Sequence, residues 1–446
     1  MRRIEPLLPF AAVLVCLLAC VPLLTKYPAP GSDEPGFVDP AITLLNDGYL
    51  GTTLYEGLVP TMDRHIYWQP PFYFVALAGW FWIFGPGLEQ ARLFSLAGGL
   101  SIVALVYLLA RRWTGPWPAF AVSTLCAVSY WLTTRAAFAR MDTLCVALSL
   151  AAVLAYARRR VWLAGILAGL AFLTHPLGVV PIATIVADQA LTRRPWADIR
   201  RACTGVVLGG MVWLIYALQD WDAFQLQMAL QLARKQQSPP YWYQFWMARN
   251  HAIAIGVVAG AAAWLAFARR RPAGSELLVI GTVVAFAAAT YAHETGYFLY
   301  FFPFGCVALA LAVGRHTFAS LALAGALASE AAILGYNIHR YNHRNYAALG
   351  DAVRAVIPPG ASVFIGFADV TPYFALVGRN PMSVATPVPL ADPRAHGRLA
   401  AQSDFIVTTI PDPYLPDVSD VIRGKTPLAV IDQGPGYRIA VFAGKR

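Results

Sequence analysis

Residues 7–25 read LLPFAAVLVCLLACVPLLT, a stretch without one charged side chain that is long enough to cross a lipid bilayer. A membrane-spanning helix needs about 20 mostly apolar residues. Similar stretches recur along the 446-residue chain, of which 58% is hydrophobic and only 13% is charged. Soluble domains are about 45–50% apolar and about 25% charged. The composition therefore excludes a soluble enzyme, a disordered chain and, because the stretches do not alternate, an outer-membrane barrel. It predicts a polytopic all-α membrane bundle.

Short arginine clusters between the apolar segments predict how the chain is oriented. The expected spans are 7–25, 92–110, 116–133, 143–157, 161–174, 176–192, 203–218, 251–268, 276–292, 297–313 and 317–336. The clusters are Arg2/Arg3, Arg111/Arg112, Arg158–Arg160, Arg193/Arg194 with Arg200/Arg201, Arg269–Arg271 and Arg315. Positive charge gathers in cytoplasmic loops. We therefore expect about 11 transmembrane helices in the cell membrane and a cytoplasmic N-terminus. The net charge of +10 reflects this orientation and indicates no nucleic-acid partner.

The apolar segment 70–84 must not cross the membrane if all six clusters are cytoplasmic. It opens with Pro70-Pro71, is rich in aromatic residues and ends at the Gly-Pro-Gly of residues 85–87. Short aromatic helices suit the membrane interface or a re-entrant position. We predict an interfacial helix here. The alternative, a full crossing, would turn Arg111/Arg112 and Arg158–Arg160 outward.

The two ends of the chain differ in character. No small-residue cleavage site precedes Lys26, so we interpret the first apolar run as an uncleaved span. Residues 337–446 combine an amphipathic stretch (346–357) with short apolar runs at 362–367, 404–409, 428–432 and 437–442. This pattern predicts a small extracytoplasmic α/β domain, to which we assign no catalytic chemistry. Residues 1–336 form the predicted transmembrane catalytic domain, with a first outer loop at 26–91.

No metal or disulfide motif stands out. All six cysteines (Cys16, Cys20, Cys126, Cys145, Cys203, Cys306) lie in apolar segments, so neither a disulfide framework nor a CxxC metal site is implied. A divalent metal can be accommodated near Asp33 and Asp142, but no dense ligand cluster requires one.

Charged residues at the predicted outer ends of the spans suggest where chemistry takes place. Asp33 and Glu34 follow the first span, and Asp142 begins the fourth. Carboxylates at membrane depth are costly and usually functional or paired, and a general base must reach a substrate hydroxyl. Arg92, Arg135 and Arg140 also lie at outer ends, where guanidinium groups can bind phosphate in a bidentate manner. Together they suggest transfer from a lipid-linked phosphate, with the arginines stabilising the leaving group.

Simpler interpretations apply to each of these residues. Asp33 and Glu34 can form a solvated turn, and Asp142 can cap its helix with Arg140 as a local partner. His65 can be an ordinary polar loop residue, and His175 is best explained as a helix-end residue. The aromatic cluster at 241–246 can form an interfacial belt or seat a prenyl chain.

Taken in order, several motifs resemble those of the GT-C glycosyltransferases, in particular family 39 with its aminoarabinose-transferase and protein-mannosyltransferase relatives. The motifs are DEP (33–35), YWQPPFY (67–73), ARLFSLAGGL (91–100), RMD (140–142), LTHPLG (173–178) and HETGYFLYFFP (293–303). They cover most of the membrane region. The chain departs from the pattern at Gln69, where many relatives have a basic residue, and at His175, where many have lysine.

The resemblance implies an integral-membrane glycosyltransferase. It would transfer a sugar, with inversion, from a polyprenyl-phosphate-linked donor to a lipid, glycan or protein acceptor on the outer face of the membrane. It implies that Asp33 is the general base, that Asp142 is a second acidic residue, and that Arg92 and Arg140 bind phosphate. The candidate catalytic residues are Asp33, Glu34 and Asp142; the candidate substrate-binding residues are Arg92, Arg140, His65, Tyr67, His293, Tyr297 and Tyr300.

Rival functions remain at this stage. The main alternative is a polytopic transporter or flippase for lipid-linked glycans, although the chain shows no matched halves with broken helices. A glycan polymerase or ligase would usually carry its key charges in a large later loop, whereas here the acidic pair lies in the first. A receptor or scaffold would use the outer domain instead.

Overall fold

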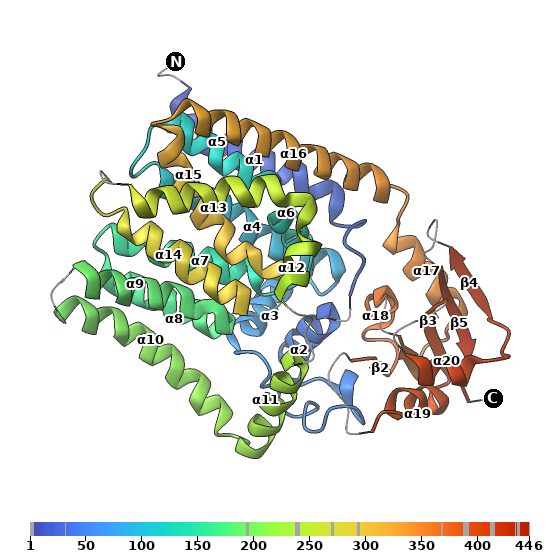
Figure 1. Ribbon diagram of the computed structural model, residues 1–446. Helices are drawn as coiled ribbons and strands as arrows, with labels where there is room; N and C mark the ends of the chain where they lie inside the picture. The colour runs from blue at the N-terminus through green and yellow to red at the C-terminus, as the bar shows by residue number, and fades with distance from the viewer. Residues whose placement is uncertain are drawn as a thin grey trace.

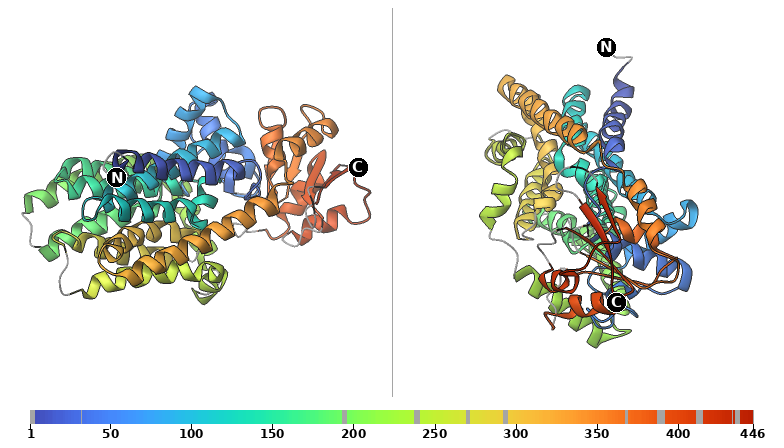
Figure 2. Two further views of the ribbon diagram at one scale, coloured as in Figure 1. Left: turned by 90° about the horizontal axis from the view of Figure 1, so that it is seen from above. Right: turned by 90° about the vertical axis from the view of Figure 1, so that its right-hand side faces the viewer.

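The chain folds into a long helical bundle with a small sheet-containing domain at one end (Figure 1). The computed structural model describes residues 4–31, 33–192, 196–236, 241–268, 272–291, 295–366, 369–386, 392–410, 415–432, 434 and 438–445. Helix α16 (Thr317–Tyr341) runs along the bundle and leads into the C-terminal domain (Figure 2). The N-terminus lies toward the opposite end of the bundle.

Each of the predicted spans coincides with a helical segment. The bundle contains α1 (Leu8–Cys20), α4 (Leu88–Ala110), α5 (Pro116–Val128), α6 (Tyr130–Ala136), α7 (Asp142–Ala157), α8 (Val161–Thr174), α9 (Val179–Thr192), α10 (Trp196–Ala217), α13 (Ala252–Phe267), α14 (Glu276–Tyr291), α15 (Phe298–Val313) and α16. By length and composition, four segments qualify as membrane spans: Glu5–Leu23, Leu88–Ala110, Arg249–Phe267 and Thr317–Val356. The bent pair α10 and α11 (Trp221–Gln236) adds a fifth if it counts as one span. The membrane-protein class is confirmed, and the count of eleven crossings stays a prediction.

Helices α8 and α10 pack closely through two GxxxG motifs. Gly165 and Gly169 of α8 face Gly205 and Gly209 of α10, and a Cβ built on any of these glycines would press on the backbone of the other helix. Small residues at such positions let two helix backbones approach, which is a common way to associate helices in lipid. The contact fixes α10, which then turns by 108° into α11.

The predicted span 116–133 is broken in two at Ser129. The Ser129 backbone is extended and separates α5 from α6. At the break, the buried Glu330 of α16 accepts a hydrogen bond from the Tyr130 backbone N–H (2.9 Å) and lies 2.9 Å from Nδ1 of His251. A buried carboxylate is costly unless it is paired. The same hydrogen bond therefore satisfies the backbone N–H that the helix break exposes and the carboxylate of the buried Glu330.

The segment predicted to be interfacial forms α3 (Phe72–Phe84), a helix of 13 residues. At 1.5 Å per residue it is about 20 Å long, shorter than the hydrocarbon core of about 30 Å. It buries Phe74 and Phe81, whereas Trp82 is 78% exposed and Ile83 is 65% exposed. Helices α1 and α5 are equally short, so the interfacial placement of residues 70–84 stays a prediction.

The C-terminal domain is built on a mixed five-stranded sheet in the order β2-β1-β3-β5-β4. Its elements are α17 (Tyr346–Val356), β1 (Val363–Ile365), α18 (Thr371–Leu376), β2 (Met382–Val384), α19 (Ala395–Gln402), β3 (Phe405–Thr409), α20 (Pro416–Ile422), β4 (Ala429–Asp432) and β5 (Arg438–Ala443). Strand β1 pairs in parallel with β2 and β3, and β5 pairs antiparallel with β3 and β4. The predicted α/β character and four of the strands are confirmed.

The domain shares a hydrophobic core with the segment that the sequence predicts to be the first outer loop, here called the first outer segment. This segment contains α2 (Asp33–Asp47), the turn Thr53–Tyr55 and α3. Phe37 and Val38 of α2 belong to the same buried cluster as Leu349 of α17 and Tyr373 of α18. Helix α2 therefore lies between the bundle and the C-terminal domain (Figure 1).

Candidate active site

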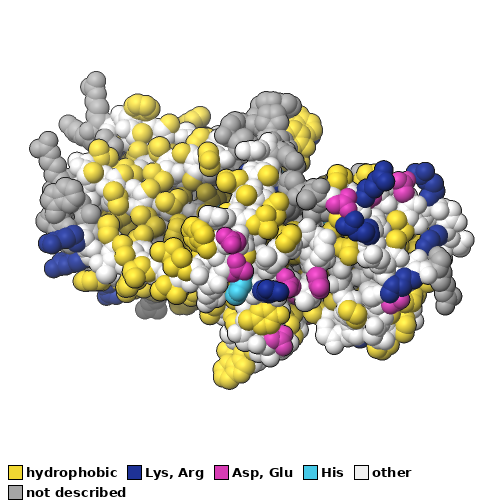
Figure 3. Space-filling model, turned by 90° about the horizontal axis from the view of Figure 1, so that it is seen from below, with side chains coloured by type: hydrophobic (Ala, Val, Ile, Leu, Met, Phe, Trp, Pro, Cys, Tyr) yellow, Lys and Arg dark blue, Asp and Glu magenta, His cyan; other side chains and the backbone are white. Residues whose placement is uncertain are grey.

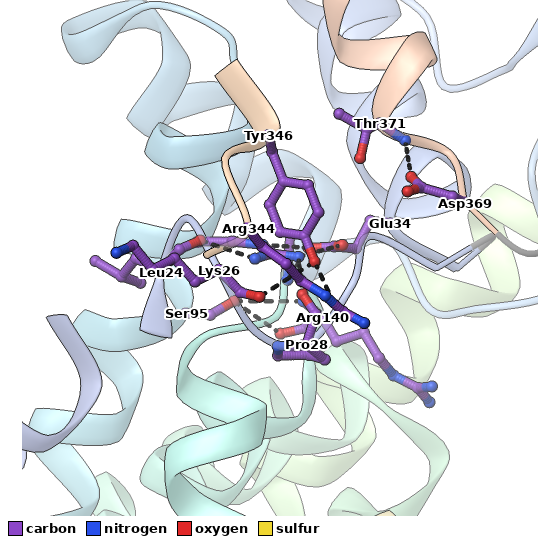
Figure 4. A network of polar contacts seen from close by, with 12 residues as sticks. Leu24, Lys26, Pro28, Glu34, Ser95, Arg140, Arg344, Tyr346, Asp369 and Thr371 are labelled. Atoms are coloured by element: carbon purple, nitrogen blue, oxygen red, sulfur yellow. Dashed lines mark hydrogen bonds and ion pairs between the residues drawn. The ribbon is translucent and has the colours of Figure 1, made fainter. Parts of the chain in front are cut away.

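The site forms where the N-terminus of α2 meets the loop between α6 and α7. Asp33 is the first residue of α2, and the positive end of a helix dipole favours an acid there. Arg140 precedes α7, and its backbone is held by Ser95 of α4: the Arg140 N–H donates to Oγ of Ser95 at 3.3 Å (Figure 4). Asp33 and Arg140, which are 107 positions apart in the sequence, are thereby brought into contact.

Arg140 binds the carboxylates of both Asp33 and Asp142. Its Nη1 donates to Oδ2 of Asp33, and its Nε lies 2.9 Å from Oδ2 of Asp142. Asp142 is fully buried, Arg140 is 6% exposed, and the Asp33 side chain is 31% exposed. Asp142 begins α7 but does not cap it, since the N-cap residue is Met141. Asp33 is thus the one of the two acids that solvent or a substrate can reach.

Three aromatic side chains lie beside Arg140 and Asp142. Nη2 of Arg140 approaches the Tyr297 hydroxyl (3.4 Å), and the Tyr300 hydroxyl lies 3.4 Å from Oδ1 of Asp142. The His175 ring is 5.5 Å from the Tyr297 ring and 5.7 Å from the Tyr300 ring, measured between centroids. Nδ1 of His175 also accepts a hydrogen bond from the Leu177 N–H, as expected of a helix-end residue.

Glu34 and Arg92 form a separate, fully buried ion pair. Both N–H···O distances between them are short (2.9 and 2.8 Å), and the Ala139 N–H also donates to Glu34. The Arg92 guanidinium further donates to the carbonyls of Leu24 and Pro28. Its N–H groups are directed into the protein, so this geometry does not support the predicted phosphate contact of Arg92 or the predicted catalytic role of Glu34, and both stay predictions. It favours a structural role for both.

His65 and Tyr67 belong to a different cluster. Their rings stack at 5.5 Å, and Tyr67 packs against Tyr216 of α10 and Phe224 of α11. Gln227 accepts from the Tyr67 N–H and donates to the His65 carbonyl. Within the described ranges, no hydrogen bond or ion pair links this cluster to Asp33, Arg140 or Asp142. The next residue, Trp68, instead packs against the Tyr55 ring, on the side of α2. The predicted site residue His293 lies outside the described residues.

Two further cations border the site. They were not among the predicted site residues. The ammonium group of Lys235, near the end of α11, lies 5.2 Å from the centre of the Tyr297 ring. The guanidinium of Arg135 lies over Gly296, where a Cβ would collide with it. Arg135 forms no hydrogen bond or ion pair with the residues that the structure describes. Its position at an outer helix end was visible in the sequence, whereas the approach of Lys235 depends on the bend between α10 and α11.

The acidic residues do not form an evident metal site. Over the described part of the chain, no three His, Cys, Asp or Glu side chains gather closely enough to hold an ion. The space between Asp33 and Asp142 is occupied by the Arg140 guanidinium, so we derive no step through a metal.

Comparisons with known proteins agree with this architecture. Residues 68–220, about a third of the chain, match the family model described as dolichyl-phosphate-mannose-protein mannosyltransferase. The structure of ArnT from Cupriavidus metallidurans bound to undecaprenyl phosphate superimposes with a TM-score of 0.64 at 16% identity, over 98% of this chain and 97% of that one. The chain has the GT-C fold.

Further solved structures have the same fold, whereas no curated sequence matches the chain. The same ArnT in the apo state gives a TM-score of 0.66 at 17% identity, over 98% of this chain and 97% of that one. The oligosaccharyltransferase AglB from Archaeoglobus fulgidus, in complex with an inhibitory peptide and a dolichol-phosphate, gives 0.57 at 14% identity, over 91% and 69%. No curated protein sequence matches the chain. The GT-C resemblance predicted from the sequence is therefore confirmed at the level of the fold.

Proposed function

We propose that this GT-C protein is a membrane glycosyltransferase that moves a sugar from a polyprenyl-phosphate-linked donor to a lipid, glycan or protein acceptor. The observation that carries the proposal is the partly exposed Asp33 carboxylate, held on Arg140 beside the buried Asp142 and Tyr297. This arrangement brings a base, Asp33, and a cation, Arg140, together in one site. The donor class is supported by the lipid phosphates in the ArnT and AglB structures.

The cations of the site would bind the donor phosphate. Arg140, Arg135 and Lys235 all lie against Tyr297 or its neighbour Gly296. Guanidinium groups match the oxygens of a phosphate, and hydrogen bonds between charged partners are roughly twice as strong as neutral ones. As the sugar–phosphate bond breaks, negative charge grows on the phosphate, so fixed cations lower the barrier.

Asp33 would act as the general base. Without a donor, Arg140 binds Asp33 directly, so the guanidinium occupies a carboxylate oxygen that would otherwise face the acceptor. A donor phosphate competes for the same guanidinium and releases Asp33 toward the acceptor. The acceptor hydroxyl or amine then attacks the anomeric carbon and gives its proton to Asp33, while the bond to the phosphate oxygen breaks. A single displacement of this kind inverts the anomeric configuration.

We place the site at the outer face of the cell membrane. Figure 3 shows lysine and arginine side chains at the end of the bundle away from the C-terminal domain, followed by a broad apolar band. Beyond this band, side chains of both charges appear next to the C-terminal domain and on its surface. This arrangement supports a cytoplasmic N-terminus and an extracytoplasmic C-terminal domain.

The proposal is tested with purified protein and a panel of radiolabelled polyprenyl-phosphate sugars. We expect the wild type to release polyprenyl phosphate and to label an acceptor in a membrane extract, and Asp33→Asn to abolish both. The substitution Asp63→Asn, in an exposed ion pair of the same outer segment with Arg64, is the matched control. Full transfer by Asp33→Asn would refute the mechanism. Movement of labelled lipid across vesicles without transfer would establish the flippase alternative, and loss of transfer in EDTA would establish a metal requirement.

A further inference from the structure

Helix α2 is held by its acidic side chains on three different elements. Asp33 contacts Arg140, and Glu34 is paired with Arg92 of α4. The third acid, Asp39, faces the C-terminal domain. Its carboxylate accepts a hydrogen bond from the Tyr373 hydroxyl of α18 (2.8 Å) and another from the Thr52 hydroxyl (2.7 Å).

The contact between Asp39 and Tyr373 is half-buried, and a second contact lies beside it. Tyr373 is fully buried, and burial raises the pKa of the Asp39 carboxyl, an effect that the two hydroxyl donors oppose. The neighbouring Val370 N–H donates to the Pro30 carbonyl (3.1 Å), just before α2 begins. The C-terminal domain thus holds both the helix and the chain that leads into it.

Helix α2 depends on such external contacts because its own backbone ladder is incomplete. Pro40 lies inside the helix and provides no N–H, so one internal hydrogen bond is missing. Asp39 directly precedes this point. Asp33 lies six residues away, about 9 Å along the helix axis, so a tilt of α2 at Asp39 displaces Asp33. A displacement of about 1 Å in a catalytic group can cost about 100-fold in rate.

We propose that Tyr373 and Asp39 are positioning residues, through which the C-terminal domain holds the catalytic helix with Asp33 against Arg140. This inference rests on the proposed function, and it makes the C-terminal domain part of the catalytic apparatus. The role of Asp39 is geometric: its oxygens receive the two hydroxyl donors, and its charge takes no part in the transfer.

Three variants separate geometry from charge. Tyr373→Phe removes the donor, and Asp39→Ala removes the acceptor. Asp39→Asn keeps a carbonyl oxygen for Tyr373. We expect kcat to fall about tenfold or more in the first two, with the donor KM unchanged, and to recover in Asp39→Asn. An Asp39→Asn protein as slow as Asp39→Ala would overturn the proposal, because charge rather than position would then matter.

The matched control is Tyr346→Phe. The Tyr346 hydroxyl also joins the C-terminal domain to the bundle, by donating to the Lys26 carbonyl at 3.2 Å (Figure 4), but it does not bind α2. We expect it to lower thermal stability about as much as Tyr373→Phe and to leave kcat unchanged. Equal losses of kcat in the two variants would reduce the role of Tyr373 to general stability.

Hydrogen exchange gives a readout that does not depend on activity. Amides of residues 33–47 should exchange faster in Tyr373→Phe than in the wild type or in Tyr346→Phe. Unchanged exchange would overturn the positioning role. If the wild type transferred no sugar from any donor, the proposed function would fail, and this measurement would still decide whether Tyr373 holds α2.

Discussion

Gly296 shows how a residue without a side chain shapes the site. Its missing Cβ leaves room for the Arg135 guanidinium, which therefore lies against the residue that precedes Tyr297, whose hydroxyl Arg140 contacts. Arg140 is already shared between two carboxylates. Among the described residues, Arg135 has no such partner. It is consequently the cation whose charge is most available to an incoming phosphate.

Replacing Arg135 should weaken donor binding. Hydrogen bonds to charged groups contribute about 1.5–3 kcal/mol, so Arg135→Gln should raise the donor KM about 10- to 150-fold with a smaller effect on kcat. Gly296→Ala should act in the same direction, because its methyl group displaces the guanidinium. Steady-state kinetics over a range of donor concentrations measure both. An unchanged KM in Arg135→Gln would exclude the phosphate contact.

Arg92 should affect stability rather than donor affinity. Removing one partner of a buried ion pair leaves the other charge uncompensated, which costs about 3–5 kcal/mol. Arg92→Met should therefore lower the unfolding temperature in detergent, and the double variant Glu34→Gln/Arg92→Met should regain part of the loss. A stable Arg92→Met protein that no longer binds donor would instead support the phosphate role first predicted for this residue.

The candidate residues could be chosen from the sequence, but their grouping could not. Asp33, Arg140 and Asp142 were identifiable as charges at the ends of apolar segments. The sequence does not reveal that Arg92 turns inward to Glu34, since this depends on carbonyls at Leu24 and Pro28 that only the folded chain brings near. Likewise, Tyr67 and Trp68 are adjacent in the sequence, yet Tyr67 packs against α10 and α11 whereas Trp68 packs against Tyr55.

At the scale of elements, the helices of the predicted spans followed directly from apolar run length, whereas their interruptions and the less apolar helices α2 and α11 did not. The break at Ser129 falls inside an apolar run, and its stabilising contact comes from Glu330, about 200 residues away. Strand β2, only three residues long, was missed because it has no alternating pattern of its own. Its pairing with β1 determines it instead.

The packing of α8 on α10 predicts opposite signs for two similar substitutions. Alanine is favoured over glycine in a helix by about 1 kcal/mol, so Gly260→Ala in α13, where a Cβ meets nothing within 4 Å, should stabilise the protein. Gly169→Ala should destabilise it by about 1–3 kcal/mol, because the methyl group collides with the Gly205 carbonyl. Thermal unfolding compares the two. Equal shifts would show that the close approach of α8 and α10 is unimportant.

At the scale of the whole molecule, the C-terminal domain is joined to the bundle by polar as well as apolar contacts. Lys26 and Tyr27, at the end of the first span, contact Asn342 and Tyr341 at the end of α16. Pro30 and Asp39 are bound by residues of the α18 region. The stability of this junction and the position of α2 are therefore coupled.

Asp369, which lies in this junction, should make stability depend on pH. Burial raises its pKa to about 7, although the Thr371 N–H donates to it at 2.7 Å. An aspartate in the unfolded chain titrates near 3.9. As pH rises from about 4 to about 7, the unfolded state therefore releases this proton more readily than the folded state, and stability is lost.

In Asp369→Asn this contribution disappears, so the unfolding temperature of the variant minus that of the wild type should increase from pH 5 to pH 8. Asp351→Asn, at a side chain that is 71% exposed, is the control for removing an aspartate from the surface of the same domain. A constant difference for Asp369→Asn would mean that its carboxyl group is not buried in the junction. Because the junction also holds α2, a loss of donor turnover that follows the same pH range would connect the stability of the domain to the position of Asp33.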